Sequence, residues 1–141
     1  MGQIRIRRST NKHSANIISK LDKICFPNDV PVTGQDPNTI WWIAWVDGEA
    51  VGYAGLTRNK TYWFLSRAGV LPAWRGRGLQ KQFIKKRVEY AQSESNLPIY
   101  TYTVIDNSPS ANSLISAGFR LHDPPYSWWG AVNVWKYRDK S

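Results

Sequence analysis

The amino-acid sequence predicts a domain of the α/β (α+β) class, with a central sheet flanked by helices. Two observations lead to this prediction. Segments with strand or helix periodicity follow one another in the order β-α-(loop)-β-β-β-α-β-α-β-β. The length of 141 residues suits one hydrophobic core, so we expect a single domain over residues 1–141. The hydrophobic content of 42% excludes wholesale disorder, and without a run of 18 apolar residues we expect no membrane span.

The N-terminal half is predicted to form four strands and one helix. Alternation and β-propensity place the strands at residues 3–8, 40–46, 50–56 and 61–70. A helix over roughly residues 12–24 leaves Asp22 outside its buried face, which is expected to hold Ile17, Ile18, Leu21 and Ile24. A loop or short helix follows over residues 28–39. Asp47-Gly48 is typical of a type I′ hairpin turn between the second and third strands.

The C-terminal half is predicted to alternate helices and strands. An amphipathic basic helix begins after Gly78 and runs to about Ser93. Ser108 at the N-cap and Pro109 at the first helical position begin a short helix. This helix ends at Ala117, before a glycine. The remaining segments are predicted strands, over residues 97–105, 119–121 and about 127–137.

The stretch from Gly69 to Gln80 joins a strand to the basic helix and carries the strongest chemical signal. Its glycines let the backbone approach a ligand closely, because they have no Cβ. Arg75, Arg77 and Lys81 place three cations at a helix N-terminus that already carries about half a positive charge. Because unpaired N–H groups at such a helix start bind phosphate, the pattern predicts an anion site.

Two well-known glycine loops do not fit this stretch. The G-x-x-x-x-G-K-[ST] spacing of the Walker A loop is absent. Gly76-x-Gly78 matches the start of the dinucleotide fingerprint, but Lys81 stands at the third glycine position. A solvated strand-to-helix turn that is merely basic remains the alternative.

The pattern V-x-P-x-x-R-G-x-G before a basic helix resembles the acyl-CoA pyrophosphate loop of the GCN5-related N-acetyltransferases (GNAT). The family's pattern is Q/R-x-x-G-x-G/A. Arg75 and Gly78 match it, and Gln80 stands where the family has Gly or Ala.

A second segment resembles the family motif N-x-x-A-x-x-x-Y-x-x-x-G-F. Here it reads Asn107-x-x-Ser110-x-x-x-Leu114-x-x-x-Gly118-Phe119. The two motifs stand at the expected separation, so the resemblance covers most of the chain.

The resemblance implies a single N-acetyltransferase domain with a mixed, mostly antiparallel sheet. Six to seven strands would be flanked by about four helices on the two faces. In this fold the strand before the glycine loop and the strand ending at Ile105 run parallel and splay apart. The splay opens a wedge for the pantetheine arm.

The resemblance also implies acetyl-CoA as co-substrate. The loop would hold the pyrophosphate, and a backbone N–H at the end of the preceding strand would stabilise the oxyanion. The residues expected to bind the cofactor are Gly69, Val70, Arg75, Gly76, Arg77, Gly78, Leu79, Gln80, Lys81, Asn107 and Ser110.

The expected reaction is direct acetyl transfer to a primary amine of unknown identity. A lysine-like amine is roughly 99.9% protonated at pH 7, so it needs a base. A water chain is the first choice and Glu49 the second, with Asp29 and Asp106 also open. The family's tyrosine acid falls at Leu114 here. Tyr126 or water is left as the acid, unless the thiol departs as thiolate.

The net charge of +9 attracts nucleic acid, phosphate-bearing ligands or acidic proteins. This charge exceeds what one CoA needs. The alternative function is therefore a catalytically weak or inactive basic module that binds nucleic acid or a protein partner. The expected assembly is a monomer or a homodimer.

Cysteine and histidine usage favours a metal-free, cytoplasmic protein. Cys25 is the only cysteine, so neither an intrachain disulfide nor a thiolate zinc site is expected. Cys25 also lies outside the motifs, which favours transfer without a covalent enzyme intermediate. His13 and His122 are far apart and are assigned structural roles.

Eight tryptophans are an unusual number for this length. We assign most of them to core packing and leave a substrate-stacking role open for one or two. Five of them lie in two predicted strands. Trp41, Trp42 and Trp45 are in one strand, and Trp128 and Trp129 are in the other.

Overall fold

The computed structural model describes residues 2–9, 14–104, 107–122 and 132–138. The elements follow the predicted order: β1 (Arg5–Arg8), α1 (Ser14–Cys25), β2 (Thr39–Val46), β3 (Glu49–Arg58), β4 (Trp63–Val70), the 3₁₀ helix η1 (Pro72–Trp74), α2 (Leu79–Glu94), β5 (Ile99–Val104), α3 (Ser108–Ser116), β6 (Phe119–His122) and β7 (Val132–Tyr137). The fold class is confirmed. Within the described residues, three α-helices and one 3₁₀ helix stand where about four helices were expected.

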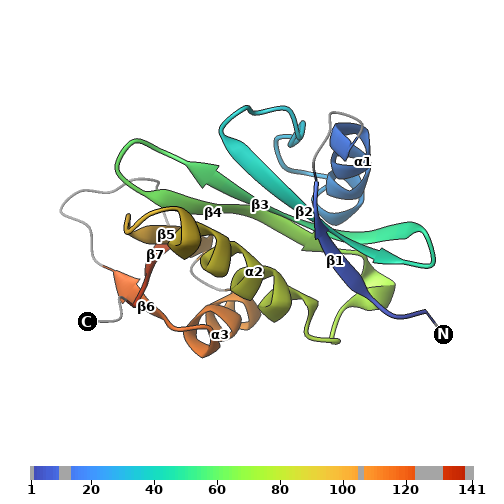
Figure 1. Cartoon of the computed structure of the whole chain (residues 1–141). Helices are drawn as coiled ribbons and strands as arrows, with labels where there is room; N and C mark the ends of the chain where they lie inside the picture. The colour runs from blue at the N-terminus through green and yellow to red at the C-terminus, as the bar shows by residue number, and fades with distance from the viewer. Residues whose placement is uncertain (1, 10–13, 105–106, 123–131, 139–141) are drawn as a thin grey trace.

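The seven strands form one sheet in the order β1-β2-β3-β4-β5-β7-β6. Every neighbouring pair is antiparallel except β4 and β5, which run parallel. Figure 1 shows α2 and α3 against one face of the sheet and α1 against the other. The mixed, mostly antiparallel sheet with one parallel pair is therefore as predicted.

The sheet carries a separate hydrophobic core on each face. The larger core lies under α2 and α3, and Phe83 of α2 is fully buried in it. The smaller core lies under α1, where Ile18 packs with Tyr53 of β3. The strand residues alternate between the two cores, as the period of a strand requires.

The β2–β3 hairpin turns at Asp47 and Gly48, whose φ angles are 48° and 81°. Positive φ at both central residues is the signature of a type I′ turn. The predicted turn is therefore confirmed.

The prediction for the buried face of α1 was wrong at two positions. Ile24 is 57% exposed, whereas the Asp22 side chain is only 1% exposed. The buried stripe runs through Ala15, Ile18 and Leu21 and continues through Asp22 instead of Ile24. Asp22 can occupy this stripe because the sheet offers its carboxylate hydrogen-bond donors.

Within the described residues, element boundaries differ from the prediction by at most two residues. Asn107, not Ser108, is the N-cap of α3, since its side chain accepts a hydrogen bond from the Ser110 N–H at 3.2 Å. An amide side chain caps a helix as readily as a hydroxyl does, so sequence did not separate the two candidates. Parts of three predicted elements, residues 12–13, Ile105 and residues 127–131, lie outside the described residues.

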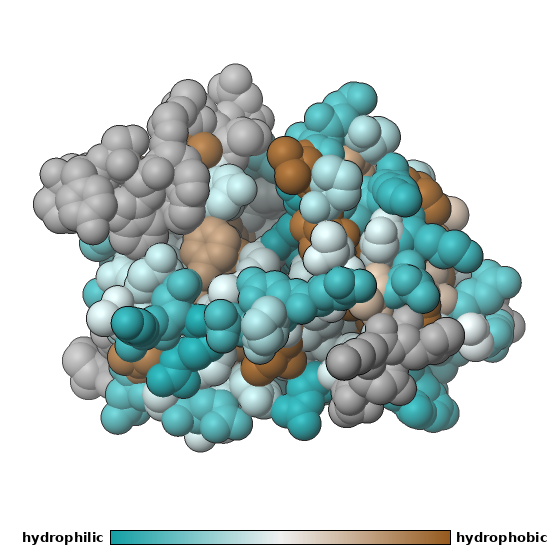
Figure 2. All heavy atoms as spheres, turned by 90° about the horizontal axis from the view of Figure 1, so that it is seen from above, coloured by the Kyte–Doolittle hydropathy of each residue, from teal (hydrophilic) through white to brown (hydrophobic). Residues whose placement is uncertain are grey.

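The helices that the structure describes include none with the length and apolarity needed to cross a membrane. Figure 2 views the molecule from above, the side on which α1 lies in Figure 1. Hydrophilic residues cover most of the described surface in this view, and hydrophobic residues appear in small separate groups.

Candidate active site

Strands β4 and β5 stop pairing after two residue pairs, and we call the unpaired stretch between them the wedge. The parallel ladder pairs Trp63 with Ile99 and Phe64 with Tyr100, and within the described strands it includes no later pair. At the point where pairing stops, the Thr101 hydroxyl donates to the Leu65 carbonyl at 2.9 Å. Both strands continue beyond this bridge, so their facing edges keep backbone groups available to a ligand.

A β-bulge bends β4 beside the wedge. The register places two residues of β4, Ser66 and Arg67, opposite Gly55 of β3. Arg87 of α2 contacts the bulge from the face of the sheet that α2 covers. Its guanidinium donates to the carbonyls of Gly55 and Ser66, both at 3.0 Å. Burial lowers the pKa of Arg87 to about 9, so the side chain is still charged at neutral pH.

The end of β4 presents one N–H group to the wedge. Leu71 N–H donates to the Val51 carbonyl of β3 at 2.9 Å. Because N–H groups alternate between the two edges of a strand, the Val70 N–H points to the opposite edge, toward the wedge. Of the two residues predicted to supply the oxyanion donor, Val70 has this orientation and Gly69 does not.

The N-terminus of α2 follows immediately and has no side-chain cap. Gly78 is its N-cap residue, and the first turn contains no acidic side chain. The Gln82 N–H donates to the Gly78 carbonyl, which leaves the N–H groups of Leu79, Gln80 and Lys81 without a partner inside the helix. Free N–H groups at a helix start can bind an anion, and we call this group of three the cradle.

The two loop glycines are required by backbone conformation. Gly76 and Gly78 have φ angles of 79° and 80°, the left-handed region that other residues rarely adopt. A Cβ at either position would meet no atom within 4 Å. The empty space above both residues also leaves the loop backbone open to a ligand.

Three cations surround this cradle, and they are arranged differently. Arg75 turns back to the strand, and its Nε donates to the Val70 carbonyl at 2.9 Å. The Arg77 guanidinium lies 4.7 Å from the ring centroid of Trp74. Neither these arginines nor Lys81 forms an ion pair with an acid among the described residues. The loop therefore keeps its positive charge.

Cys25 lies outside the motifs in sequence but against them in space. A Cβ added to Gly69 would approach the Cys25 Sγ to 2.9 Å and the Tyr53 ring to 2.7 Å. Burial raises the pKa of the Cys25 thiol above its ordinary value, although the neighbouring Arg75 works against this shift. The thiol is protonated at neutral pH and is a poor nucleophile.

A buried polar cluster, which sequence reasoning missed, links α1 to β4. The Asp22 carboxylate accepts hydrogen bonds from the Tyr53 hydroxyl at 2.5 Å and from Arg67 Nη1 at 3.2 Å. It also accepts from the Val32 N–H at 2.9 Å, and Arg67 Nη1 donates to the Val30 carbonyl at the same distance. The cluster therefore fixes the loop after α1 above the bulge.

The described residues include one of the two predicted catalytic residues and the second family motif. Glu49 is exposed in the β2–β3 hairpin, three residues along β3 from Gly52, the partner of Val70. Tyr126 lies outside the described residues. Asn107 and Ser110 meet in the cap of α3, and Leu114 is buried in the larger core.

Among the described residues, the remaining candidates do not gather into a catalytic cluster. Asp29 is exposed, 4.0 Å from Arg67 Nη2, and Asp106 lies outside the described residues. His122 packs 5.2 Å from the Tyr100 ring centroid, which is a structural contact, and His13 lies outside the described residues. Within the described part of the chain, no three His, Cys, Asp or Glu side chains are placed to hold a metal ion.

Solved structures with the same architecture include three acetyltransferases. The ribosomal-protein-S18-alanine N-acetyltransferase from Escherichia coli matches with a TM-score of 0.78 at 11% identity, over 96% of this chain and 93% of that chain. A Bacillus anthracis protein assigned as a streptothricin acetyltransferase, in complex with acetyl coenzyme A, matches with a TM-score of 0.76 at 16% identity. The match covers 98% of this chain and 99% of that chain. The Bacillus subtilis acetyltransferase in complex with CoA matches with a TM-score of 0.76 at 14% identity, over 96% of this chain and 98% of that chain. At these identities the likeness concerns the fold.

The sequence comparison is more decisive. No curated protein matches the chain in sequence. The family model of the acetyltransferase (GNAT) family matches residues 13–119, which include α1, the bulged strand, the glycine loop and α3. With the match spanning most of the chain, the protein belongs to the GNAT acetyltransferase family.

Proposed function

We propose that the protein is an acetyl-CoA-dependent N-acetyltransferase that moves the acetyl group directly to a primary amine. The observation that carries the proposal is the uncapped N-terminus of α2 beside the open wedge. It offers an anion three N–H groups and three cations that form no ion pair with an acid among the described residues. The presence of acetyl coenzyme A or CoA in two structures of similar fold supports the choice of co-substrate.

The residues present suit the diphosphate of that co-substrate. The backbone from Arg75 to Lys81 would hold the diphosphate, because its N–H groups and glycines leave an exposed cradle. Arg77 and Lys81 would contact the outer phosphate. When bound, acetyl-CoA would supply a thioester whose acetyl group is ready for transfer. The Val70 N–H would stabilise negative charge that develops on the carbonyl oxygen.

The amine is expected to approach from the α1 face of the sheet. Helices α2 and α3 cover the other face of the wedge. On the α1 face, Tyr102 of β5 is 42% exposed and stacks on Phe64 of β4, with ring centroids 5.7 Å apart. The Asp22–Arg67 cluster holds the adjacent loop in place. These contacts support the α1 face as the side from which the acceptor enters.

Proton transfer is assigned to water in this proposal. Glu49 remains the second choice of base, and the acid is either Tyr126 or water. Leu114 cannot donate a proton and is 5% exposed in the core. A thiol with a pKa near 8.5 can depart as thiolate, so the reaction does not depend on an acid. The protonated Cys25 thiol supports transfer without a covalent enzyme intermediate.

One further function is favoured by specific observations. Leu114 occupies the position of the family's acid, and the chain carries a net charge of +9. A GNAT domain that binds nucleic acid or an acidic protein with little catalysis would have both features. As part of either proposal, the protein is a cytoplasmic monomer or homodimer; a lone cysteine, which cannot form an intrachain disulfide, suits the reducing cytoplasm.

The test combines binding and turnover. Acetyl-CoA binding is measured by calorimetry, and thiol release is followed colorimetrically with small amines, peptides and nucleotides as acceptors. Lys81→Glu should weaken acetyl-CoA binding by roughly tenfold or more, since it replaces a cation with an anion at the cradle. Lys86→Glu, an equal charge change further along α2, should have a much smaller effect. Binding without turnover on any amine would favour the non-catalytic alternative.

A further inference from the structure

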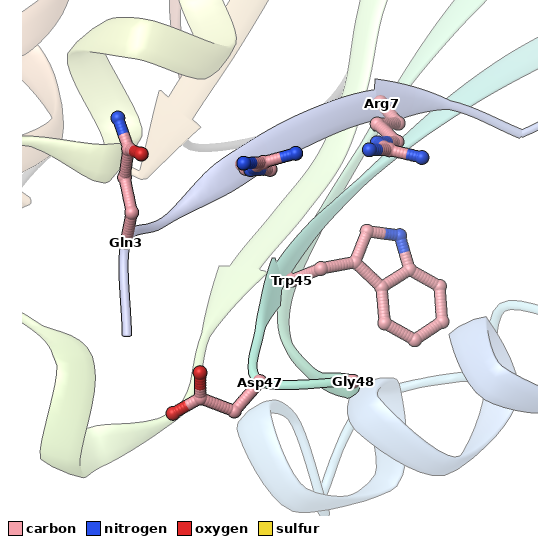
Figure 3. A pocket seen from close by; sticks show the side chains of 6 residues that line it. Gln3, Arg7, Trp45, Asp47 and Gly48 are labelled. Carbon is pink, nitrogen blue, oxygen red and sulfur yellow. The ribbon is translucent and has the colours of Figure 1, made fainter. Parts of the chain in front are cut away.

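A pocket of about 450 Å³ lies away from the wedge, at the edge of the sheet formed by β1. This edge pocket is lined by Gln3, Arg5, Arg7, Trp45, Asp47 and Gly48 (Figure 3). Its size falls within the range of small-molecule sites. Three strand spacings, about 14 Å in all, separate β1 from β4. The edge pocket and the wedge can therefore be occupied at the same time.

The alternation of β1 places both arginines on one face. Ile4 and Ile6 pack against the larger core, so Arg5 and Arg7 point to the opposite face. Trp45 packs against the smaller core on that same face and is directly opposite Arg5 in the register. The two arginine positions are about 7 Å apart along the strand. Two cations thus border the ring of one half-buried tryptophan.

These groups are not neutralised by their neighbours. Neither Arg5 nor Arg7 forms an ion pair with an acid in the part of the chain that the structure describes. Figure 3 shows the Asp47 carboxylate pointing away from the Trp45 ring, while Arg7 lies beside that ring. Within the same residues, the guanidinium groups that lie over aromatic rings do not include Arg5 or Arg7. The pocket therefore presents a ring and two charges to a ligand.

We propose that the edge pocket binds a nucleotide unit, with its base against Trp45 and its phosphate between Arg5 and Arg7. Arginine suits phosphate because its planar fork donates two parallel hydrogen bonds. An aromatic ring beside a cationic groove is the combination that binds bases of any sequence. The unit is either a free nucleotide or part of a single strand. The net charge of +9 provides long-range attraction for a strand.

Arginines on an edge strand have a second use, since they discourage pairing with another chain. That use requires neither a cavity nor a tryptophan. It also predicts no difference between Arg5, Arg7 and the neighbouring Arg8. Arg8 stacks on Tyr90 of α2, on the other face of the sheet. It therefore provides a matched control of equal charge on the same strand.

The experiment measures binding of three probes to the full chain by calorimetry and fluorescence anisotropy. The probes are uridine monophosphate, a labelled single-stranded thymidine oligonucleotide and a glutamate peptide of the same length. Each is titrated into the wild-type protein and into Arg5→Ala, Arg7→Ala, Arg8→Ala and Trp45→Leu. Trp45→Phe retains a ring, and thermal melting verifies that each variant is folded.

The proposal expects Trp45→Leu to weaken nucleotide binding by roughly 5- to 150-fold, the range that corresponds to the stacking of one base. Trp45→Phe should restore most of this loss. Arg5→Ala and Arg7→Ala should each lower the salt slope for the oligonucleotide by about 0.7, and Arg8→Ala should leave it unchanged. Binding of uridine monophosphate identifies a free nucleotide as a ligand. Binding of the oligonucleotide alone identifies the strand.

Three results would overturn the proposal. The first is that neither nucleotide probe binds. The second is that Arg8→Ala and Arg5→Ala change the salt slope for the oligonucleotide equally. The third is that the glutamate peptide binds as tightly as the oligonucleotide. The loop variant Gly78→Val should bind the probes as the wild type does. This comparison distinguishes binding at the edge pocket from binding at the cofactor loop, so one assignment can fail without the other.

Discussion

Replacing Asp22 by asparagine tests the buried cluster that joins α1 to the bulged strand. The carboxylate accepts from the Tyr53 hydroxyl, the Arg67 guanidinium and the Val32 N–H. Asparagine keeps the shape of the side chain but removes the charge. It also replaces one carboxylate oxygen with an NH₂ group, which cannot accept a hydrogen bond from the surrounding donors. Tyr53 and Asp22 are both essentially inaccessible to water, so solvent cannot replace the lost interactions.

The expected cost follows from the partners. Breaking a buried ion pair costs about 3–5 kcal/mol. The Arg67 side chain is 24% exposed, so solvent screens part of its charge and the lower end of that range applies. We therefore expect Asp22→Asn to lower the free energy of unfolding by about 3 kcal/mol. For a chain of this length, that corresponds to a fall in Tm of roughly 9–15 °C.

The assay is urea and thermal unfolding at neutral pH, with Asp29→Asn as the matched control. Asp29 faces the same arginine at 4.0 Å but its side chain is 56% exposed, so its loss should cost no more than about 1 kcal/mol. Limited proteolysis should cut the loop after α1 faster in Asp22→Asn, because the Val32 anchor is lost. Equal costs for the two variants would refute the assignment of Asp22 as the centre of a buried cluster.

Further predictions concern stability and pH. Burial raises the pKa values of Tyr53 and Cys25, so in alkali the unfolded chain loses protons that the folded chain keeps, and stability should fall as the pH rises. For Tyr53 the fall should approach about 1.4 kcal/mol per pH unit above about pH 10, and melts of Tyr53→Phe between pH 8 and 11 should show the smaller slope. Asn107→Ala should cost about 1 kcal/mol in urea unfolding through loss of the α3 cap, and a cost near zero would contradict the cap. Gly69→Ala should cost about 1–3 kcal/mol by overpacking against Tyr53 and Cys25, where a neutral result in thermal melts would contradict the close contact. Arg87→Met should cost about 2 kcal/mol by leaving carbonyls at the bulge without a donor, and unchanged unfolding would contradict its supporting role.

Local sequence signals predicted the elements and the glycine loop well. The Asp47-Gly48 turn was predictable because type I′ geometry needs two residues that tolerate positive φ. The conformation of the glycine loop was predictable because Gly76 and Gly78 can adopt the positive φ found there. Both features depend on neighbouring residues alone. The position of the parallel pair followed from the family resemblance.

The buried charges were missed because their partners are distant in sequence. Asp22 meets Arg67 of β4, and Arg87 of α2 donates to carbonyls of β3 and β4. Hydrophobic periodicity assigns charged residues to the surface by default. A signal was nevertheless present, since Asp22 follows Ile18 at helical spacing and Arg87 follows Phe83 in the same way. A charged residue in an apolar stripe predicts a buried partner, but its identity comes only from the fold.

Cys25 illustrates the same limit. Sequence alone placed Cys25 outside the site because it is far from the motifs along the chain. In the structure, Cys25 lies at the end of α1 with its Sγ against Gly69. The raised pKa of the thiol, rather than its position, is what argues against a covalent role.

The central claim is that the start of α2 binds the diphosphate of acetyl-CoA, and calorimetric titration of one pair of variants tests it most directly. Gly78 and Gly48 have almost the same φ, 80° and 81°, and a Cβ at either meets no atom within 4 Å. Valine strains both turns equally, but only Gly78 lies at the cradle. We predict saturable acetyl-CoA binding by the wild type and Gly48→Val, and loss of binding in Gly78→Val. Equal binding by both variants, or no saturable heat with the wild type, would contradict the account.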